Sequence, residues 1–370
     1  MSRRLVHIQT AGFATPNGRA FLMPLLLHRQ LLLDAGIELK LFSAEYAKDD
    51  LPDCDYLIVD SKALSPRWAK GKDQILSEMQ KNRSKAGALI FCDISDSASW
   101  DHAHILPFVD LYCKSQLLVD RSLYLQPLYG HRYYADYYHR FFGINDDQHE
   151  SSEPVSNPDD LKKLCVGWNS GLADYSLFGP LRMALYEKAP FKTLLRFPWN
   201  CKAPSVGRRM NASLRMGTNY SRRSVAFHRR YLAEMLGSRL QTGKLSRRAY
   251  FRELSRSKLV VSPFGLGEIT LRDFEVFLAG AMLVKPDMSH METWPNFYMP
   301  GETFLSYKLD FSDFEVVLET ALSDEHRLLE VARAGQSRYL TYVSGPEAGL
   351  LFVDHFKAIL DRCILRKGHD

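Results

Sequence analysis

The chain lacks several features that would place it outside the ordinary globular proteins. Its 370 residues include six cysteines, none of them in a Cys-x-x-Cys pair. That scarcity argues against a disulfide scaffold and a zinc site, and it predicts reduced, mostly buried thiols in a cytoplasm. No stretch approaches the ~20 apolar residues of a membrane span. The first residues enter a strand-like run without the apolar region of a signal peptide. We expect a cytoplasmic protein without a bound metal.

Acidic residues are also scarce in one part of the chain. Residues 202–258 contain 15 Lys or Arg and 2 Asp or Glu, although the net charge of the whole chain is only +5. The remainder is therefore net acidic. A concentrated basic segment indicates an anionic partner, such as nucleotide phosphates, nucleic acid or an anionic membrane surface. The alternative is a pair of basic helices whose charged side chains face water.

Apolar runs alternate with helix-like segments along the first 150 residues. This alternation is typical of a doubly wound α/β domain with a parallel sheet. Ligands of such domains bind at the carboxyl ends of the strands. We therefore expect Gly12, Asn17 and Gly18, in the loop after the first strand, on the acceptor side of a cleft. The predicted strands cover residues 5–8, 37–42, 56–59 and 88–91, and the predicted helices cover residues 20–35 and 70–83.

The clearest linker is the polar, acidic, proline-containing stretch at residues 145–160. It predicts a first domain over residues 1–150 and a second over 161–345. A terminal helix over 346–370 is expected to pack back on the first domain. The aromatic-rich residues 123–143 precede the linker, and they favour either interdomain packing or an aromatic wall for an acceptor.

The most informative segment begins with a short apolar strand at residues 259–261. Gly265 and Gly267 follow, and glycine lets a backbone approach a ligand closely. Thr270 and Asp273 form a capping box, which predicts a helix starting at the next residue after Thr270. The first amide protons of a helix lack partners, so a helix start after a glycine loop is a ready anion site.

Two charged residues of this helix share one face. Arg272 and Glu275 are three positions apart, so a phosphate near Arg272 and a sugar hydroxyl near Glu275 would suit the geometry. Arg222 begins another predicted helix, over residues 221–236, where a cation opposes the helix dipole. A bound anion would remove that conflict, so Arg222 and Arg223 of the first turn are phosphate candidates. The alternative is that these arginines point into water. Arg215, at the end of a possible strand over residues 211–215, is a further donor-binding candidate.

Residues 208–296 resemble the donor-binding segment of the GT-B glycosyltransferases, enzymes with two facing Rossmann-like domains. The resemblance rests on a strand, Gly-Glu268, Arg272-Asp-Phe-Glu275, a glycine and Val-Lys285-Pro. More narrowly, the segment is similar to bacterial family-1-type transferases of surface-polysaccharide (O-antigen or capsule) clusters, and its Arg-x-x-Glu resembles the exostosin-like motif. The resemblance implies a nucleotide-sugar co-substrate without other cofactor or metal, and a glycan or lipid-linked acceptor.

The resemblance also implies roles for individual residues. Glu275 matches the glutamate that holds the nucleotide ribose, and Arg272 would face the diphosphate. Glu268 stands at the first of two paired acidic positions and is a catalytic candidate, with six intervening residues where many such enzymes have seven. The remaining donor-side candidates are Gly265, Gly267, Lys285, His290, Glu292 and Thr293.

The acceptor hydroxyl must be oriented and, in an inverting enzyme, deprotonated by a positioned base. His7, Asp93 and Asp96 lie at predicted strand ends of the first domain, and Asp96 is our preferred base. The alternative for Asp93 and Asp96 is that they cap the residues that follow them. The sequence leaves retention and inversion open.

Two other functions compete with glycosyl transfer. One is a nucleotide-sugar epimerase or phosphorylase on the same fold. The other is a nucleic-acid-binding protein that uses the basic segment, with Phe227, Tyr231, Tyr250 and Phe251 for base stacking, although their spacing also suits helix packing. We expect no nucleic acid partner. The basic segment can instead hold the protein at an anionic inner membrane, where lipid-linked acceptors lie.

Overall fold

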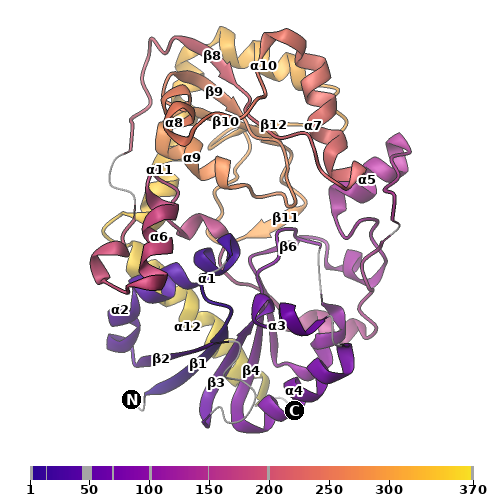
Figure 1. Cartoon of the computed structure of the whole chain (residues 1–370), viewed down its shortest axis with the longest axis vertical. Coiled ribbons are helices and arrows are strands. Elements are labelled where there is room, and N and C mark those ends of the chain that lie inside the picture. Colours follow the sequence, from indigo (N-terminus) through magenta and orange to yellow (C-terminus); the bar gives the residue numbers. More distant parts are fainter. Residues whose placement is uncertain are drawn as a thin grey trace.

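Two lobes built on parallel sheets form the molecule (Figure 1). The structure is a computed structural model that describes residues 3–13, 15–43, 52–68, 71–99, 102–148, 150–197 and 201–367. Ala14 of the predicted acceptor-side loop and His149 of the predicted linker lie outside the described residues.

The first lobe is a six-stranded sheet in the order β2-β1-β3-β4-β5-β7, with all neighbouring strands parallel. Its apolar strands are buried because helices cover them. Its strands are β1 (Arg4–Thr10), β2 (Ile37–Ser43), β3 (Cys54–Asp60), β4 (Ala86–Asp93), β5 (Leu111–Lys114) and β7 (Leu164–Val166), and its helices are α1 (Pro16–Leu27), α2 (Arg29–Asp34), α3 (Ser61–Trp68) and α4 (Lys72–Lys85). The pairing of β7 with β5 corrects the predicted start of the second domain at residue 161, since the first sheet continues to Val166.

The second lobe is a four-stranded parallel sheet in the order β12-β10-β9-β8. Its strands are β8 (Met210–Ser213), β9 (Ser257–Val261), β10 (Met282–Pro286) and β12 (Leu305–Tyr307), and its helices are α7 (Arg223–Leu236), α8 (Arg247–Leu254), α9 (Leu271–Ala279), α10 (Phe314–Ser323) and α11 (Glu325–Val343). The predicted fold class, an α/β protein with parallel sheets in two facing lobes, is confirmed.

Several elements join the lobes. β6 (Gln116–Leu118), from the first half of the chain, pairs antiparallel with β11 (Met291–Thr293) of the second. Between the sheets in sequence lie α5 (Tyr133–Phe142) and α6 (Gly179–Lys188). These connections place the carboxyl ends of the two sheets face to face, the position where parallel sheets bind ligands.

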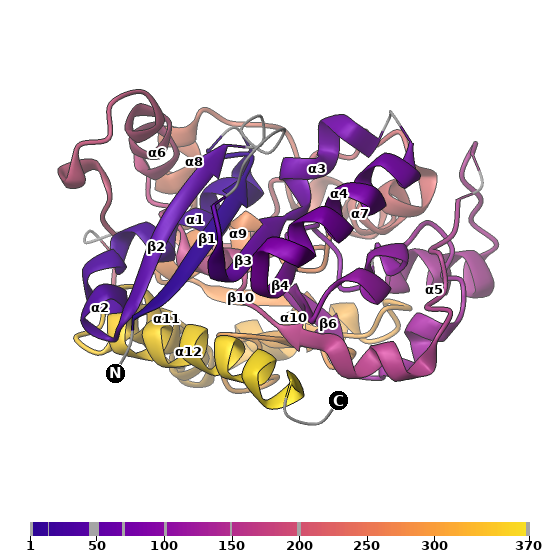
Figure 2. The ribbon, with the colours of Figure 1, turned by 90° about the horizontal axis from the view of Figure 1, so that it is seen from below.

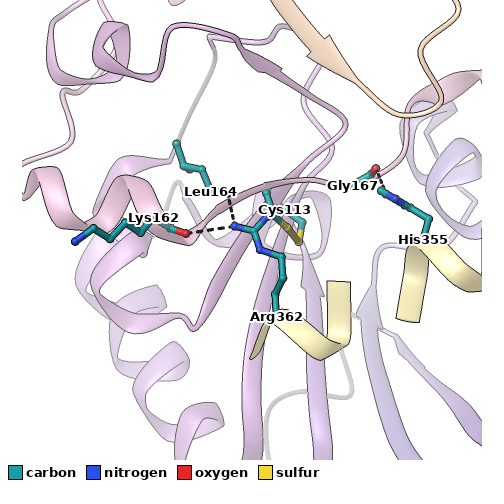
Figure 3. The surroundings of a disulfide bond; sticks show 7 residues. Cys113, Lys162, Leu164, Gly167, His355 and Arg362 are labelled. Carbon is teal, nitrogen blue, oxygen red and sulfur yellow. Dashed lines mark hydrogen bonds between the residues drawn. A yellow bond between two sulfur atoms is a disulfide. The ribbon is translucent and has the colours of Figure 1, made fainter. Parts of the chain in front are cut away.

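The last helix, α12 (Ala348–Lys367), returns to the first lobe and runs along it (Figure 2). His355 Nε2 lies 2.7 Å from the carbonyl oxygen of Gly167, and Arg362 donates to the carbonyl oxygen of Leu164 at 3.2 Å (Figure 3). Asp361 forms an ion pair of 2.6 Å with Arg4. The helix thus holds the end of the chain against β1 and the segment around β7.

A disulfide joins Cys113 of β5 to Cys165 of β7 (Figure 3). The two residues are register partners on neighbouring strands, with their Cα atoms 4.7 Å apart. The prediction of six reduced thiols is therefore wrong for this pair. Sequence spacing does not reveal which residues of two strands face each other, so the bridge could not be foreseen.

Among the helices in the described part of the chain, none combines the length and the apolar character that crossing a bilayer requires.

We expect the fold to be sensitive to acid because three of its histidines are partly or fully buried. Burial lowers the pKa of His28, His102 and His131 to about 4 each. An unfolded histidine titrates near pH 6.5, so below that pH the unfolded chain binds protons that the folded chain does not. We expect the contribution of these histidines to the free energy of unfolding to be complete above pH 6.5 and to be lost progressively as the pH falls toward 4.

Urea denaturation at several pH values measures this loss. The variant His28→Gln should reduce the slope of stability against pH between 6.5 and 4 by up to about 1.4 kcal/mol per pH unit. His326 is highly exposed, so His326→Gln serves as the control and should leave the slope unchanged. An equal slope in the His28 variant and the parent would contradict the assignment.

Candidate active site

The glycine loop and α9 adopt the structure that the sequence predicts. α9 begins at Leu271, and the Thr270 amide donates to Asp273 Oδ2 at 3.1 Å, which completes the capping box. Gly280 ends the helix in the left-handed conformation, with φ of 65°. The start of α9 is therefore fixed at the carboxyl edge of the second sheet.

A buried ion pair supports this loop from beneath. Lys285 Nζ lies 3.1 Å from Asp273 Oδ2, both side chains are fully buried, and the Tyr298 hydroxyl donates to the same carboxylate. Burial lowers the pKa of Lys285, and Asp273 opposes that effect. Lys285 thus pairs with Asp273 in the interior of the second lobe, which corrects the prediction that it contacts the donor.

A pocket of about 410 Å³ opens beside the start of α9. It brings Arg272 and Glu275 together, as the sequence predicts for a donor site. Their neighbours in the wall come from α7, α8 and the segment before α8. The full lining is Arg229, Leu245, Arg247, Tyr250, Thr270, Leu271, Arg272 and Glu275.

Arginine dominates the electrostatics of this pocket. Arg247 Nη1 lies 3.0 Å from Glu275 Oε1, and Arg229 Nε donates to the carbonyl oxygen of Phe264 at 2.7 Å. Nε and Nη1 of Arg272 are buried without a hydrogen-bond partner among the residues that the structure describes. Burial raises the pKa of Glu275, and Arg247 and Arg272 offset part of the rise. Three guanidinium groups against one carboxylate leave a strong positive excess for an anionic ligand.

Sequence reasoning did not single out Arg229 as a pocket residue. One signal was available, because Arg229 shares the apolar face of α7 with Val225 and Leu232, four residues before it and three after it. All three side chains are buried. An arginine on a buried helix face is rare unless it is paired, so this position indicates a function or a structural contact.

Two other predicted phosphate ligands lie elsewhere. Arg215 forms a bidentate pair with Glu253, with Nη2 2.7 Å from Oε2. Arg222 pairs with Glu150, and the Asp146 carboxylate accepts from the Ser224 amide at 2.8 Å at the start of α7. The anion that relieves the dipole conflict at the start of α7 is therefore the Asp146 carboxylate of the acidic linker. Neither arginine lines the pocket, which corrects their predicted donor-binding roles.

Much of the basic segment is engaged in the same way. Arg223 pairs with Asp147, Arg239 with Glu315 and Lys258 with Glu325. The ring of Phe227 packs against Tyr138 and Phe142 of α5. The aromatic stretch at 123–143 therefore contributes to the packing of α5 against α7.

The glycine loop also meets the first lobe directly. Glu268 is fully buried and accepts hydrogen bonds from Ser97 Oγ and the Ala98 amide, both at 3.0 Å. A Cβ atom added to Gly267 would lie 1.7 Å from the carbonyl oxygen of Asp96. The predicted catalytic role of Glu268 is corrected on this evidence, because its carboxylate fastens the two lobes together and has no open face.

Neighbouring predicted residues belong to the same contact between the lobes. The His290 ring stacks on Tyr133, and its Nε2 lies 3.9 Å from Glu268 Oε1. Burial raises the pKa of Glu268, but the contacts with His290 and the Ala98 amide outweigh it, so the pKa is lowered. The Thr293 hydroxyl donates to the carbonyl oxygen of Ser115 at 2.8 Å.

The carbonyl oxygen of Gly265 accepts from the Tyr134 hydroxyl at 2.6 Å, and Glu292 pairs with Arg121. None of these four candidates, Gly265, His290, Glu292 and Thr293, lines the arginine pocket.

On the first lobe, predicted residues gather at a cavity of about 30 Å³ between the lobes. Asn17 Nδ2 donates to Asp96 Oδ1 at 2.9 Å, and both residues line this cavity. Gly12 and Gly18 flank the turn into α1, beside Asn17. Asp96 is exposed.

The other two base candidates are unsuited. Asp93 is buried in an ion pair with Lys114, with Nζ 2.8 Å from Oδ2. Burial raises the pKa of Asp93, but Lys114 outweighs it and the pKa is strongly lowered. His7 is fully buried within β1. Asp96 is left as the strand-end group that faces open space.

Comparison with known proteins supports an enzyme of sugar transfer. A family model described as glycosyl transferase-like matches residues 211–344, which include every residue of the arginine pocket. The prediction of a glycosyltransferase is thereby confirmed. No curated protein matches the chain.

Several solved structures match the chain at low sequence identity. An alpha-glucosyltransferase in complex with UDP and a 13-mer DNA is 10% identical, with 97% of this chain and 100% of that chain covered and a TM-score of 0.41. Anabaena Alr3699/HepE in complex with UDP-glucose is 10% identical over 96% and 100%, with a TM-score of 0.44. A glycosyltransferase from Rickettsia africae ESF-5 is 9% identical over 97% and 99%, with a TM-score of 0.47.

Proposed function

We propose that the chain transfers a sugar from a nucleotide-sugar donor that binds in the arginine pocket. The observation that carries the proposal is the pair of buried Arg272 nitrogens, Nε and Nη1, that have no partner among the described residues and lie beside Arg229 and Arg247 at the start of α9. A diphosphate satisfies these donors and the helix dipole together. Glu275 accepts from a ribose hydroxyl, and Leu245 and Tyr250 offer apolar surface to the base.

The arginines also supply the chemistry that departure of the diphosphate requires. Negative charge develops on the leaving group as the glycosidic bond to the nucleotide breaks. Arg272 and its two neighbours stabilise that charge without a metal ion, because guanidinium groups bind phosphate oxygens in pairs. We therefore propose a transfer that is independent of metal.

The acceptor enters from the first lobe. Asp96, held by Asn17 at 2.9 Å, orients the acceptor hydroxyl and takes its proton if the reaction inverts the anomeric centre. The resemblance of residues 208–296 to surface-polysaccharide transferases supports a glycan or lipid-linked glycan as acceptor. The protein would then act in cell-surface polysaccharide synthesis, at the cytoplasmic face of a membrane.

Product analysis tests this function. The protein is incubated with a panel of radiolabelled nucleotide-sugars, with and without lipid-linked glycan extracts, and the products are separated by chromatography. The proposal predicts free nucleoside diphosphate together with label in the glycan, with EDTA present. A changed nucleotide-sugar without an acceptor would indicate an epimerase, and a phosphate-dependent sugar phosphate would indicate a phosphorylase.

Glu275→Gln should weaken nucleotide binding and preserve the fold. The amide keeps the shape of the side chain but loses the charge that accepts a ribose hydroxyl, so we expect about a tenfold rise in the Kd, in line with one lost charged hydrogen bond. Calorimetric titration measures the Kd, and a melt without nucleotide serves as the control. A melt that collapses together with binding would instead identify a structural glutamate paired to Arg247.

A further inference from the structure

The exposed face of α6 is apolar. Phe178, Leu181 and Leu185 lie on one side at helical spacing, with exposed fractions of 51, 59 and 47%. The opposite side, which carries Gly179 and Met183, is buried against the protein. A surface helix of a globular protein ordinarily presents polar residues outward. α6 instead presents apolar residues outward, and no described part of the chain covers them.

Basic residues border the apolar side. Lys188 is exposed on the same face one turn beyond Leu185, and Lys192 is exposed beside Phe191, whose exposed fraction is 68%. Glu187 is the single acidic residue between positions 178 and 197. Figures 1 and 2 both place α6 at the outer edge of the molecule. The α6 face comprises Phe178, Leu181, Leu185, Lys188, Phe191 and Lys192.

The α6 face begins beside the donor pocket. Arg247 of the pocket donates from Nε to the carbonyl oxygen of Leu177 at 2.8 Å, and from Nη2 to those of Tyr175 and Ser176 at 3.0 and 2.9 Å. These three carbonyls immediately precede Phe178 and the start of α6. A surface bound to the α6 face is thus held next to the site of transfer.

We propose that the α6 face docks the protein on an anionic lipid bilayer. Leucine and phenylalanine side chains enter the boundary between headgroups and acyl chains, and Lys188 and Lys192 contact the anionic headgroups. The proposal rests on the proposed function, since a membrane-bound site suits a lipid-linked acceptor. It also moves the predicted membrane contact from the basic segment to the α6 face, because Arg247 of the basic segment pairs with Glu275.

Vesicle flotation of the full chain tests the docking. We expect binding to vesicles that contain phosphatidylglycerol and much weaker binding to pure phosphatidylcholine. The double variant Leu181→Asn with Leu185→Asn should lower the partition coefficient about tenfold or more, because each leucine loses burial in the bilayer. Lys188→Glu with Lys192→Glu should lower it by a similar factor on anionic vesicles only.

Two matched control pairs separate this face from general surface effects. Phe141→Asn with Val316→Asn removes apolar side chains of α5 and α10 that are more exposed than the two leucines. Lys244→Glu with Arg248→Glu reverses exposed charges of the basic segment. Both controls should bind vesicles like the parent.

Three outcomes would overturn the docking proposal. They are equal binding to neutral and anionic vesicles, parental binding by both α6 variants, and a dimer in solution that the leucine variant dissolves. The last outcome would assign the face to a second copy of the chain. Nucleotide binding is measured on the same samples, so vesicle binding without nucleotide binding would refute the proposed function and leave the docking intact.

Discussion

Arg272→Ala should lower the rate of sugar transfer by two to three orders of magnitude. The guanidinium stabilises charge that develops on the leaving diphosphate, and loss of one such donor costs about 2.7–4 kcal/mol in the transition state. The ligand-free protein should lose about 1 kcal/mol of stability or less, because among the described residues Nε and Nη1 of Arg272 have no partner and Nη2 donates to the carbonyl oxygen of Arg215. Steady-state kinetics and urea denaturation measure the two effects.

Arg248→Ala is the matched control for this prediction. Arg248 belongs to the same basic segment but is exposed and does not line the pocket, so its removal should leave the transfer rate within about twofold of the parent. A parallel loss of rate in both variants would show that the overall charge of the segment, and not Arg272, supports the reaction.

Gly267→Ala should abolish transfer but leave donor binding nearly unchanged. The new Cβ atom would lie 1.7 Å from the carbonyl oxygen of Asp96, so backbone must move and the lobes must separate at this contact. Overpacking of this kind costs about 1–3 kcal/mol. The arginine pocket lies wholly in the second lobe, so the nucleotide Kd should stay within about threefold of the parent.

Calorimetry, kinetics and small-angle X-ray scattering distinguish the consequences. We expect a larger radius of gyration in Gly267→Ala because the fastening of Glu268 to Ala98 is broken. Gly243→Ala is the control, since an added Cβ atom there meets nothing within 4 Å. Full transfer activity in the Gly267 variant would contradict the role assigned to this contact.

The prediction of α9 and its charged face rested on patterns among residues that are close in the sequence. The capping box of Thr270 and Asp273, the closing Gly280 and the three-residue spacing of Arg272 and Glu275 all act within one or two helical turns. Such interactions are fixed by neighbours in the sequence, so the start of the helix and the shared face followed directly. The alternation of strands and helices likewise revealed the parallel sheets.

Contacts between distant residues escaped prediction for a common reason. The Cys113–Cys165 bridge depends on the register of two strands, and Arg222 meets Glu150 only after the lobes have formed. Glu268 was expected at the donor, but its partners Ser97 and Ala98 come from the other lobe. A single sequence shows where charged residues and helices occur. It does not show which oppositely charged residue will lie beside each charged residue in the folded protein.

The most direct test of the central claim is the thermal shift of the protein with UDP, GDP, CMP and dTDP. A ligand that binds only the folded state raises the Tm by mass action. We expect one of the four nucleotides to raise the Tm, and we expect this rise to be abolished in Arg272→Ala and retained in Arg248→Ala. No rise with any of the four, or an equal rise in the Arg272 variant, would contradict a donor site at the start of α9.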